Sequence, residues 1–326
     1  MVEEPREAQG RPAREQRRGE RPASAPAGEA PPRSGNQPGS AAVPAWRDLG
    51  GLQVRGLVTS RFRLDGGSMY GQVPKTLWSR FSKADEENRI ALVVRSLLVR
   101  TPSALVLVDP GVGAGFSAED RRRMALDPRY DSLPGVLKAG GIDPEAVTHV
   151  ILTHLHFDHI AALGLPGPGA ALRPALPRAT VIVHCDQWAR AQAPGPKEQR
   201  SYRRRDIAVL EQLERRLVVE SEEVLPGISV HPTDGHTRGL LVVEVTGEHE
   251  RVSYPSDVIP TLAHLRLPYT TGFDLWPERL LEEKETILAR AAAEQTMLVF
   301  IHDPRTAACR VARGADGYVV REKIAL

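Results

Sequence analysis

The segment Thr153-His154-Leu155-His156-Phe157-Asp158-His159 decides how the rest of the chain is interpreted. It places three imidazoles and one carboxylate within six consecutive positions. Neutral imidazole and ionised carboxylate are the ordinary protein ligands of zinc and related metals. Mostly apolar residues at 147–152 predict a buried strand before it, and residues 160–163 begin a helical pattern. Because chance accounts poorly for so many histidines in one segment, the pattern predicts a metal site at the end of a strand.

Three further ligand-type residues lie later in the chain, each at a predicted strand end or on a tight loop. His236 lies in Gly235-His236-Thr237-Arg238-Gly239, Asp257 follows the β-prone residues 252–254, and His302 ends the apolar run 297–301. One metal cannot easily take every donor from the first segment because the segment is so short. Two adjacent metals can, so the donor set predicts a pair of sites.

The order HxHxDH, Gly-His-Thr, strand-end Asp and late strand-end His resembles the metallo-β-lactamase superfamily of metallohydrolases, from about Gly56 to the C-terminus. This resemblance implies an α/β fold, an αββα sandwich with ligands at one edge of its sheets. It implies a first metal held by His154, His156 and His236, a second held by Asp158, His159 and His302, and a bridging Asp257. Zinc is the expected divalent metal, with iron, manganese and cobalt left open. A hydroxide bridging the metals is the expected nucleophile, and Asp158 the expected catalytic residue that orients it or passes a proton.

The stretch Asp257-Val258-Ile259-Pro260-Thr261, with 268–269 and 272–274, looks like the branch of quorum-quenching lactonases and organophosphate-type hydrolases. The resemblance implies hydrolysis of a lactone or a carboxylic ester. A phosphotriesterase or phosphodiesterase using the same site is the alternative. Acyl-homoserine lactonases commonly carry a tyrosine three positions after the bridging Asp, where this chain has Pro260, and Tyr269 is a candidate replacement. A non-catalytic scaffold usually lacks a ligand, and none is missing here.

Composition gives no strong case for macromolecular partners, so the expected partner is the small-molecule substrate that the resemblance implies. The chain has 326 residues, of which 41% are hydrophobic, enough for a sizeable core. A formal net charge of +2 makes no strong case for nucleic acid or membrane partners. The two cysteines, Cys185 and Cys309, suit a reducing compartment. No apolar run approaches the roughly 18 residues of a membrane span, and the N-terminus lacks a signal-peptide core, so we expect a cytoplasmic location. A homodimer is left open.

Residues 1–45 are rich in Pro, Gly, Ala, Arg and Glu and contain few large apolar residues. Such a segment cannot bury enough surface to offset its ordering entropy, so it is predicted to be a disordered tail. A partner-binding arm is the alternative for this tail. Residues 46–326 are predicted to form the hydrolase domain.

Several elements that surround the metal motif can be predicted from local pattern. Residues 90–99 and 105–108 predict a hairpin, and Asp109 follows it, either to orient a ligand histidine or to cap a turn. Residues 62–71 predict a strand that runs into a glycine-rich loop. Near that loop, Met69, Tyr70 and Trp78 are candidates for the substrate-pocket wall or for the core.

Two amphipathic helices are predicted, over residues 203–217 and residues 277–295. The interleaved acids of the first helix favour a solvated face over a nucleic-acid patch. The other histidines fall outside the ligand pattern and are predicted to be structural or surface residues. They are His149, His184, His231, His249 and His264.

Overall fold

The computed structural model describes residues 44–169 and 171–326, which form two seven-stranded sheets and one two-stranded sheet. The described residues all belong to the compact unit Ala42–Leu326. The predicted tail, residues 1–45, lies outside the described residues except for Pro44 and Ala45. Strand order is β1-β2-β3-β4-β5-β8-β9 in the first sheet and β10-β11-β12-β13-β14-β15-β16 in the second.

The first sheet contains β1 Arg47–Asp48, β2 Gln53–Asp65, β3 Arg89–Arg100, β4 Leu105–Val108, β5 His149–Ile151, β8 Thr180–His184 and β9 Arg215–Val218. The second contains β10 Glu222–Leu225, β11 Ile228–Thr233, β12 Leu240–Thr246, β13 Arg251–Tyr254, β14 Met297–Val299, β15 Ala308–Gly314 and β16 Gly317–Ile324. The small sheet pairs β6 Gly164–Pro166 with β7 Leu172–Pro174.

The α-helices are α1 Gly66–Tyr70, α2 Lys75–Trp78, α3 Ala118–Arg123, α4 Leu133–Ala139, α5 Phe157–Ile160, α6 Cys185–Gln192, α7 Arg204–Leu210 and α8 Pro277–Glu294. The 3-10 helices are η1 Pro128–Tyr130, η2 Pro144–Ala146, η3 Ala161–Leu163, η4 Ser256–Val258 and η5 Leu262–Leu265. No helix within residues 44–169 and 171–326 is long and apolar enough to cross a membrane.

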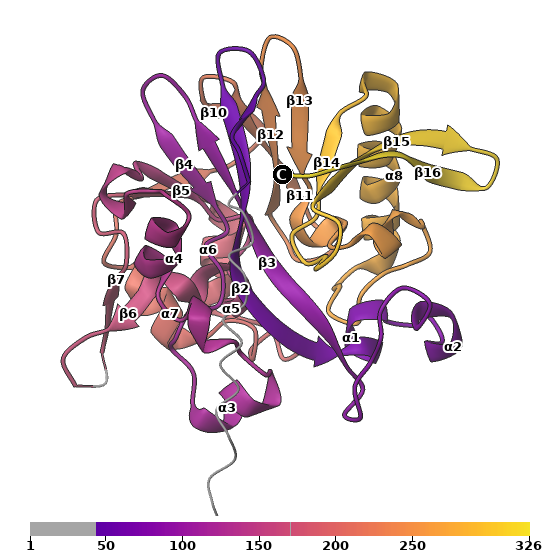
Figure 1. Cartoon of the computed structure of the whole chain (residues 1–326). Helices are drawn as coiled ribbons and strands as arrows, with labels where there is room; N and C mark the ends of the chain where they lie inside the picture. The colour runs from indigo at the N-terminus through magenta and orange to yellow at the C-terminus, as the bar shows by residue number, and fades with distance from the viewer. Residues whose placement is uncertain (1–43, 170) are drawn as a thin grey trace, which may run out of the picture. The chain divides into compact units, whose positions relative to one another are not determined.

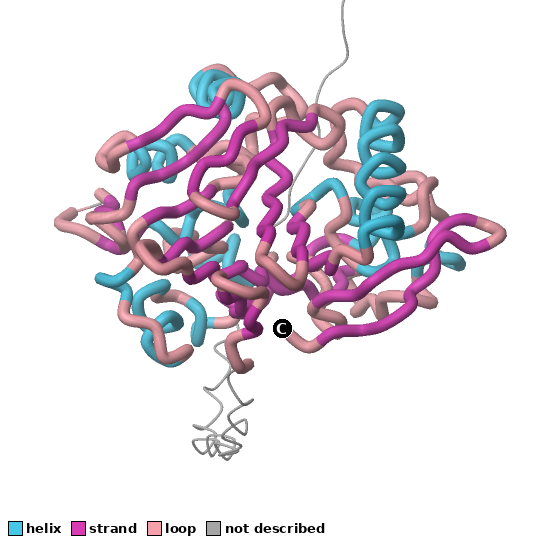
Figure 2. The backbone as a smooth tube through the Cα atoms, turned by 90° about the horizontal axis from the view of Figure 1, so that it is seen from above, coloured by secondary structure: helices cyan, strands magenta, loops and turns pink. Residues whose placement is uncertain are grey.

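The sheets and helices form four layers, as the αββα prediction requires (Figure 1). Side chains of a strand alternate between its two faces, and this alternation divides the core. Val243 packs between the two sheets, whereas its neighbour Val242 packs against α8. In the first sheet Ile151 packs between the sheets and Val150 faces the side covered by α4 and α7. Figure 2, from above, shows α8 on the outer side of the second sheet. The predicted fold class is therefore confirmed.

Parallel pairing brings the ends of several strands to one edge. Strand β5 lies between β4 and β8 and pairs parallel with both. In the second sheet β13 pairs parallel with β14. Parallel neighbours end at the same edge, so the segments that follow β13 and β14 start close together. These are the segments that contain Asp257 and His302.

Local structure departs from the sequence prediction at two places. The predicted helix over residues 203–217 ends early, because α7 stops at Leu210 and residues 215–218 form β9. Strand β9 gains backbone partners from β8, in parallel register with Val181 opposite Arg215. The predicted glycine-rich loop is also wrong, since residues 66–70 form α1, which the side chain of Asp65 caps.

Two other local predictions agree closely with the structure. The predicted hairpin of residues 90–108 is the antiparallel pair β3 and β4. The predicted long helix is α8, which ends at Glu294, one residue before the predicted end.

Candidate metal centre

The structure brings together all seven residues that the sequence predicted as ligands. They are His154, His156, Asp158, His159, His236, Asp257 and His302, and all are buried. The first four lie on the loop after β5 and in α5. The other three follow strands of the second sheet, on the β11–β12 loop, in η4 after β13, and after β14. The centre is therefore built between the two sheets.

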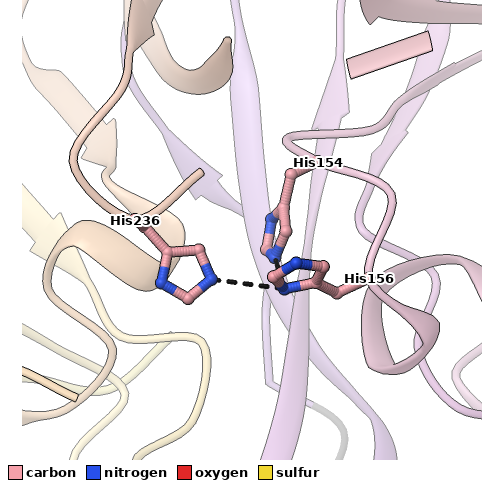
Figure 3. Close-up of side chains that lie close together, drawn as sticks. All are labelled: His154, His156 and His236. Atoms are coloured by element: carbon pink, nitrogen blue, oxygen red, sulfur yellow. Dashed lines mark hydrogen bonds between the residues drawn. The ribbon is translucent and has the colours of Figure 1, made fainter. Parts of the chain in front are cut away.

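Three of these histidines form a compact first group. His156 Nδ1 lies 3.0 Å from His154 Nε2 and 3.3 Å from His236 Nε2. Figure 3 shows the three rings directing these nitrogens toward one another. A tetrahedral zinc ion, with Zn–N bonds of about 2.0–2.1 Å, holds nitrogens about 3.3 Å apart. The spacing therefore fits a cation of that size.

Asp158, His159 and His302 form a second group whose donor atoms lie within 4.8 Å of one another. Asp257 lies between the two groups. Its Oδ2 is 3.4 Å from His236 Nε2 and 3.5 Å from His159 Nε2. Its Oδ1 is 3.1 Å from His302 Nε2. One carboxylate thus faces both groups, as the family resemblance implies for a bridging ligand.

The charge states of His154 and Asp257 and two unpartnered donor atoms also fit cation binding. Burial holds the pKa of His154 well below its ordinary value, so the imidazole is neutral. Burial alone would raise the pKa of Asp257, but His302 and His159 outweigh it and hold that pKa well below its ordinary value. For His159 and His302, burial would lower the pKa, but Asp257 and neighbouring carboxylates outweigh it and raise the pKa, so a cation would displace protons from these two rings. Within the described residues, His159 Nε2 and Asp257 Oδ1 have no hydrogen-bond partner although both are buried. Such unpartnered donor atoms are costly unless a ligand satisfies them.

Two buried carboxylates orient the histidines from outside. Asp109 Oδ2 accepts a hydrogen bond from His159 Nδ1 at 3.0 Å, so of its two predicted roles the orienting one is observed. Asp274 Oδ1 accepts from His236 Nδ1 at 2.7 Å and from Thr271 Oγ1 at 2.8 Å. Such bonds fix which ring nitrogen is free to bind a metal.

A cavity of about 30 Å³ opens on the centre. Five of the seven predicted residues line it, and the rest of its wall is mostly apolar. The other lining residues are Leu64, Met69, Phe157, Ser201, Thr271 and Phe273. Of the three wall candidates predicted from the sequence, only Met69 lines this cavity. Phe273 belongs to the segment 272–274, which resembles the lactonase branch, but no local pattern assigns it to a pocket wall. Ser201 lies in no motif that indicates a pocket.

Several candidate residues have other roles. Tyr70 and Trp78 stack on each other in the core, with ring centroids 5.4 Å apart, and do not line this cavity. Tyr269 packs edge-on against Tyr70 and Phe81, so it does not replace the tyrosine that the lactonase resemblance led us to seek.

His184 lies near Cys185 and Asp186 in a ligand-like group. However, its Nδ1 accepts from the backbone N–H of Asp186, and its Nε2 donates to the carbonyl of Val219. Neither ring nitrogen of His184 is therefore free to bind a cation.

The layered fold and the buried histidine and aspartate centre between its sheets define a metallohydrolase class. Residues 89–300 match the family model described as "Metallo-beta-lactamase superfamily", and the chain belongs to that family. A "probable metallo-hydrolase" of Mycobacterium tuberculosis is 28% identical over 237 residues, covering 66% of this chain and 73% of that protein. An N-acyl homoserine lactonase of Bacillus thuringiensis is 26% identical over 186 residues, covering 56% of this chain and 66% of that protein.

Solved structures give the same result. A "probable metal-dependent hydrolase" from Staphylococcus aureus has a TM-score of 0.76 at 25% identity, covering 85% of this chain and 100% of that one. AidC, described as a dizinc quorum-quenching lactonase, has a TM-score of 0.68 at 18% identity, covering 86% of this chain and 97% of that one. At that identity the likeness to AidC concerns the fold alone. Together these relationships establish a metal-dependent hydrolase.

Proposed function

We propose that this protein is a dinuclear metal-dependent hydrolase that cleaves a lactone or a carboxylic ester. The observation that supports this substrate class is the lining of the cavity at the centre. Apart from the predicted ligands, the described residues that line it have apolar or hydroxyl side chains, and none is lysine or arginine. A charged substituent that extends from the centre along this wall would be desolvated without a charged side chain to pair with it. The lining therefore favours a substrate whose parts beyond the reacting group are uncharged.

The size of the cavity suggests how such a substrate is held. Ligand pockets usually measure about 300–1,000 Å³, far more than the 30 Å³ found here. The cavity therefore suits the reacting carbonyl group rather than a whole substrate. Phe273 lines it while remaining 37% exposed, so the substituents of the substrate would extend outward past this side chain.

The proposed ligand assignment follows the two groups and the bridging position. His154, His156 and His236 would hold one cation, Asp158, His159 and His302 the other, with Asp257 shared. Two cations bound here would polarise the substrate oxygen and lower the pKa of a water molecule between them toward about 7. The nitrogen-rich donor set suits zinc, and also iron, manganese or cobalt.

Asp158 is the proposed catalytic residue. It lines the cavity, and its Oδ2 lies 3.6 Å from His302 Nε2. A carboxylate at this position can orient the attacking water and pass a proton to the leaving oxygen. No serine or cysteine nucleophile is required in this scheme.

Hydrolysis of a neutral phosphotriester is the second candidate, because the same uncharged lining suits that substrate. A phosphodiester is a weaker candidate, because its anionic oxygen would be bound by the cations alone, with no lysine or arginine in the described wall to hold it. The phosphotriester would use the same water and the same proton path.

A substrate panel tests the proposal. The purified protein is assayed on aliphatic lactones, aryl esters, an aryl phosphotriester and an aryl phosphodiester, before and after chelation, and after zinc is restored. We expect the highest kcat/KM on a lactone or ester, its loss with chelator and its return with zinc. Turnover that resists complete metal removal would refute the metal mechanism. A higher kcat/KM on the phosphotriester would replace the first candidate with the second.

A further inference from the structure

The outer nitrogen of His156 has no hydrogen-bond partner among the described residues. Nδ1 of this ring faces His154 and His236, so Nε2 points away from the first group. Nε2 is fully buried and unpartnered. A buried ring N–H without an acceptor is unfavourable, so the polar group that lies nearest to this atom is its candidate partner.

The other four histidines of the centre each have a partner on the outer nitrogen. His159 and His236 bind the carboxylates of Asp109 and Asp274. His302 Nδ1 donates to the carbonyl of Val93 at 2.9 Å, and His154 Nδ1 lies 3.1 Å from the hydroxyl of Thr153. His156 is therefore the exception within an otherwise consistent pattern.

Glu198 is the group that faces this nitrogen. Its Oε1 lies 3.8 Å from His156 Nε2, just beyond hydrogen-bond range, and the residue is only 3% exposed. Thr237 donates its hydroxyl to Oε1 at 2.7 Å, and Arg190 donates to Oε2. The carboxylate is thus held on both oxygens and directed at His156.

The segment that contains Glu198 also contacts the histidines of the first group in other ways. The ring of Tyr202 packs edge-on against His156, with centroids 5.0 Å apart. The backbone N–H of Phe157, next to His156, donates to the carbonyl of Ser201 at 2.9 Å. Thr237, which binds Glu198, directly follows His236 in the sequence. Residues 198–202 therefore touch both His156 and the loop that carries His236.

We propose that Glu198 is a positioning residue that accepts a hydrogen bond from His156 Nε2 and so presents Nδ1 to the first cation. This inference rests on the proposed metal centre. A shift of about 1 Å in either side chain brings the pair to the usual N–H···O distance of about 2.9 Å. The opposing interpretation is that Glu198 serves only as the buried partner of Arg190.

Metal affinity distinguishes these two interpretations. We would prepare the full chain as Glu198→Gln, which keeps an acceptor oxygen, and as Glu198→Leu, which removes both oxygens. Asp206→Asn is the matched control, because Asp206 is a carboxylate on α7 that is 2% exposed and has no hydrogen bond or ion pair to any of the seven predicted ligands. Cobalt(II) binding is measured by chelator competition and by the d–d absorption of each bound equivalent. Thermal unfolding of each metal-free protein is recorded in parallel.

We expect wild type to bind two equivalents of cobalt(II) and Glu198→Leu to bind one of them about 10–100-fold more weakly, with an altered spectrum. Glu198→Gln should lie between them, and Asp206→Asn should match wild type. Metal affinity unchanged in Glu198→Leu, with or without lower metal-free stability, would overturn the positioning role. Failure of wild type to bind cobalt(II) at all would instead refute the proposed metal centre itself.

Discussion

At the scale of single residues, Asp109 shows how much one side chain can organise. Its backbone has a φ of 50°, a left-handed conformation that asparagine and aspartate tolerate better than most residues. Its carboxylate accepts from the backbone N–H of Thr153 at 2.9 Å and from the Thr153 hydroxyl at 2.7 Å. The same carboxylate accepts from His159. Asp109 therefore ties the start of the metal loop to a predicted ligand.

Substitution of Asp109 tests this role. Asp109→Asn keeps the size and the backbone conformation but replaces one acceptor oxygen by a donor, which leaves a buried group unsatisfied. We expect unfolding to become easier by about 1–3 kcal/mol and metal affinity to fall by about 10–100-fold. Asp109→Ala should be less stable still, because alanine adds about 1–2 kcal/mol of left-handed backbone strain. Denaturant unfolding and chelator competition measure both effects. Wild-type affinity in Asp109→Asn would contradict the assignment.

At the scale of elements, the loop that carries His236 packs tightly against the start of α8. The backbone N–H of Gly235 donates to Glu283 Oε2 at 2.9 Å. A Cβ added at Gly235 would lie 2.4 Å from the backbone of Leu280 in α8. The backbone at Leu280 cannot yield easily, because its N–H is held by a helical hydrogen bond to the carbonyl of Trp276 at 2.9 Å. Position 235 therefore determines how close the loop lies to the helix.

Gly235→Ala should therefore displace the loop or the helix. We expect a loss of stability of about 1–3 kcal/mol, as in other overpacked sites, together with reduced hydrolysis because His236 moves. Gly195→Ala is the control, since its added Cβ would lie 3.6 Å from Arg190 Nη2, an ordinary contact. Thermal unfolding and kcat/KM are compared for both variants. Equal stability of the two variants would argue against the close approach.

The 3-10 helix η5 contributes a buried histidine that should make stability depend on pH. His264 Nε2 donates to the carbonyl of Met69 at 3.0 Å, and Nδ1 accepts from the Thr261 hydroxyl at 2.7 Å. Its ring also stacks on Tyr70, with centroids 5.3 Å apart. Burial, with Lys284 nearby, lowers the pKa of His264 from 6.5 to about 4. The neutral ring thus anchors α1 beside the cavity.

The sign of the pH effect follows from this lowered pKa. Between pH 6.5 and 4 the unfolded chain binds a proton at His264 and the folded protein does not, so stability falls as pH falls through this window. Across the whole window, protonation of His264 lowers the free energy of unfolding by about 3 kcal/mol. In His264→Gln this contribution should be absent, so the stability gap between the two proteins should change with pH. Denaturant unfolding of both at pH 7 and pH 5 measures it. A constant gap would show that His264 titrates normally.

At the scale of the whole described unit, the candidate centre joins the two sheets. Residues 154–159 follow β5 of the first sheet, whereas His236, Asp257 and His302 follow strands of the second. A cation held by both sets binds the folded protein and not the unfolded chain. Bound cations should therefore stabilise the pairing of the sheets.

Metal removal tests this linkage. At a free cation concentration about 1,000 times Kd, binding stabilises the fold by about 4 kcal/mol, which corresponds to roughly 10 °C in Tm for a protein of this size. We expect chelation to lower Tm by about that amount and zinc to restore it. Magnesium should not restore it, because it prefers oxygen donors and most donors here are imidazoles. An unchanged Tm after verified metal removal would contradict a cation that joins the sheets.

Sequence alone identified the seven candidate donor residues, and the family resemblance of their order implied the layered fold. Imidazole and carboxylate have metal-binding chemistry wherever they lie, and the strands that precede His154 and His302 follow from local apolar runs. The long helix α8 was equally clear, because its apolar stripe and its initial Pro277 are local features. The donor and element predictions required only residue types and short-range spacing, whereas the layered fold required the resemblance.

Only the tertiary structure decided which groups bind the outer nitrogens of the histidines, which residues line the cavity, and that β9 forms. Glu198 meets Thr237 across 39 positions and Asp274 meets His236 across 38, distances over which no local pattern carries information. Residues 215–218 have helical periodicity, yet they form β9 because β8 offers backbone hydrogen bonds that a longer α7 could not supply. Local sequence determines which groups are available, and long-range packing determines which of them meet.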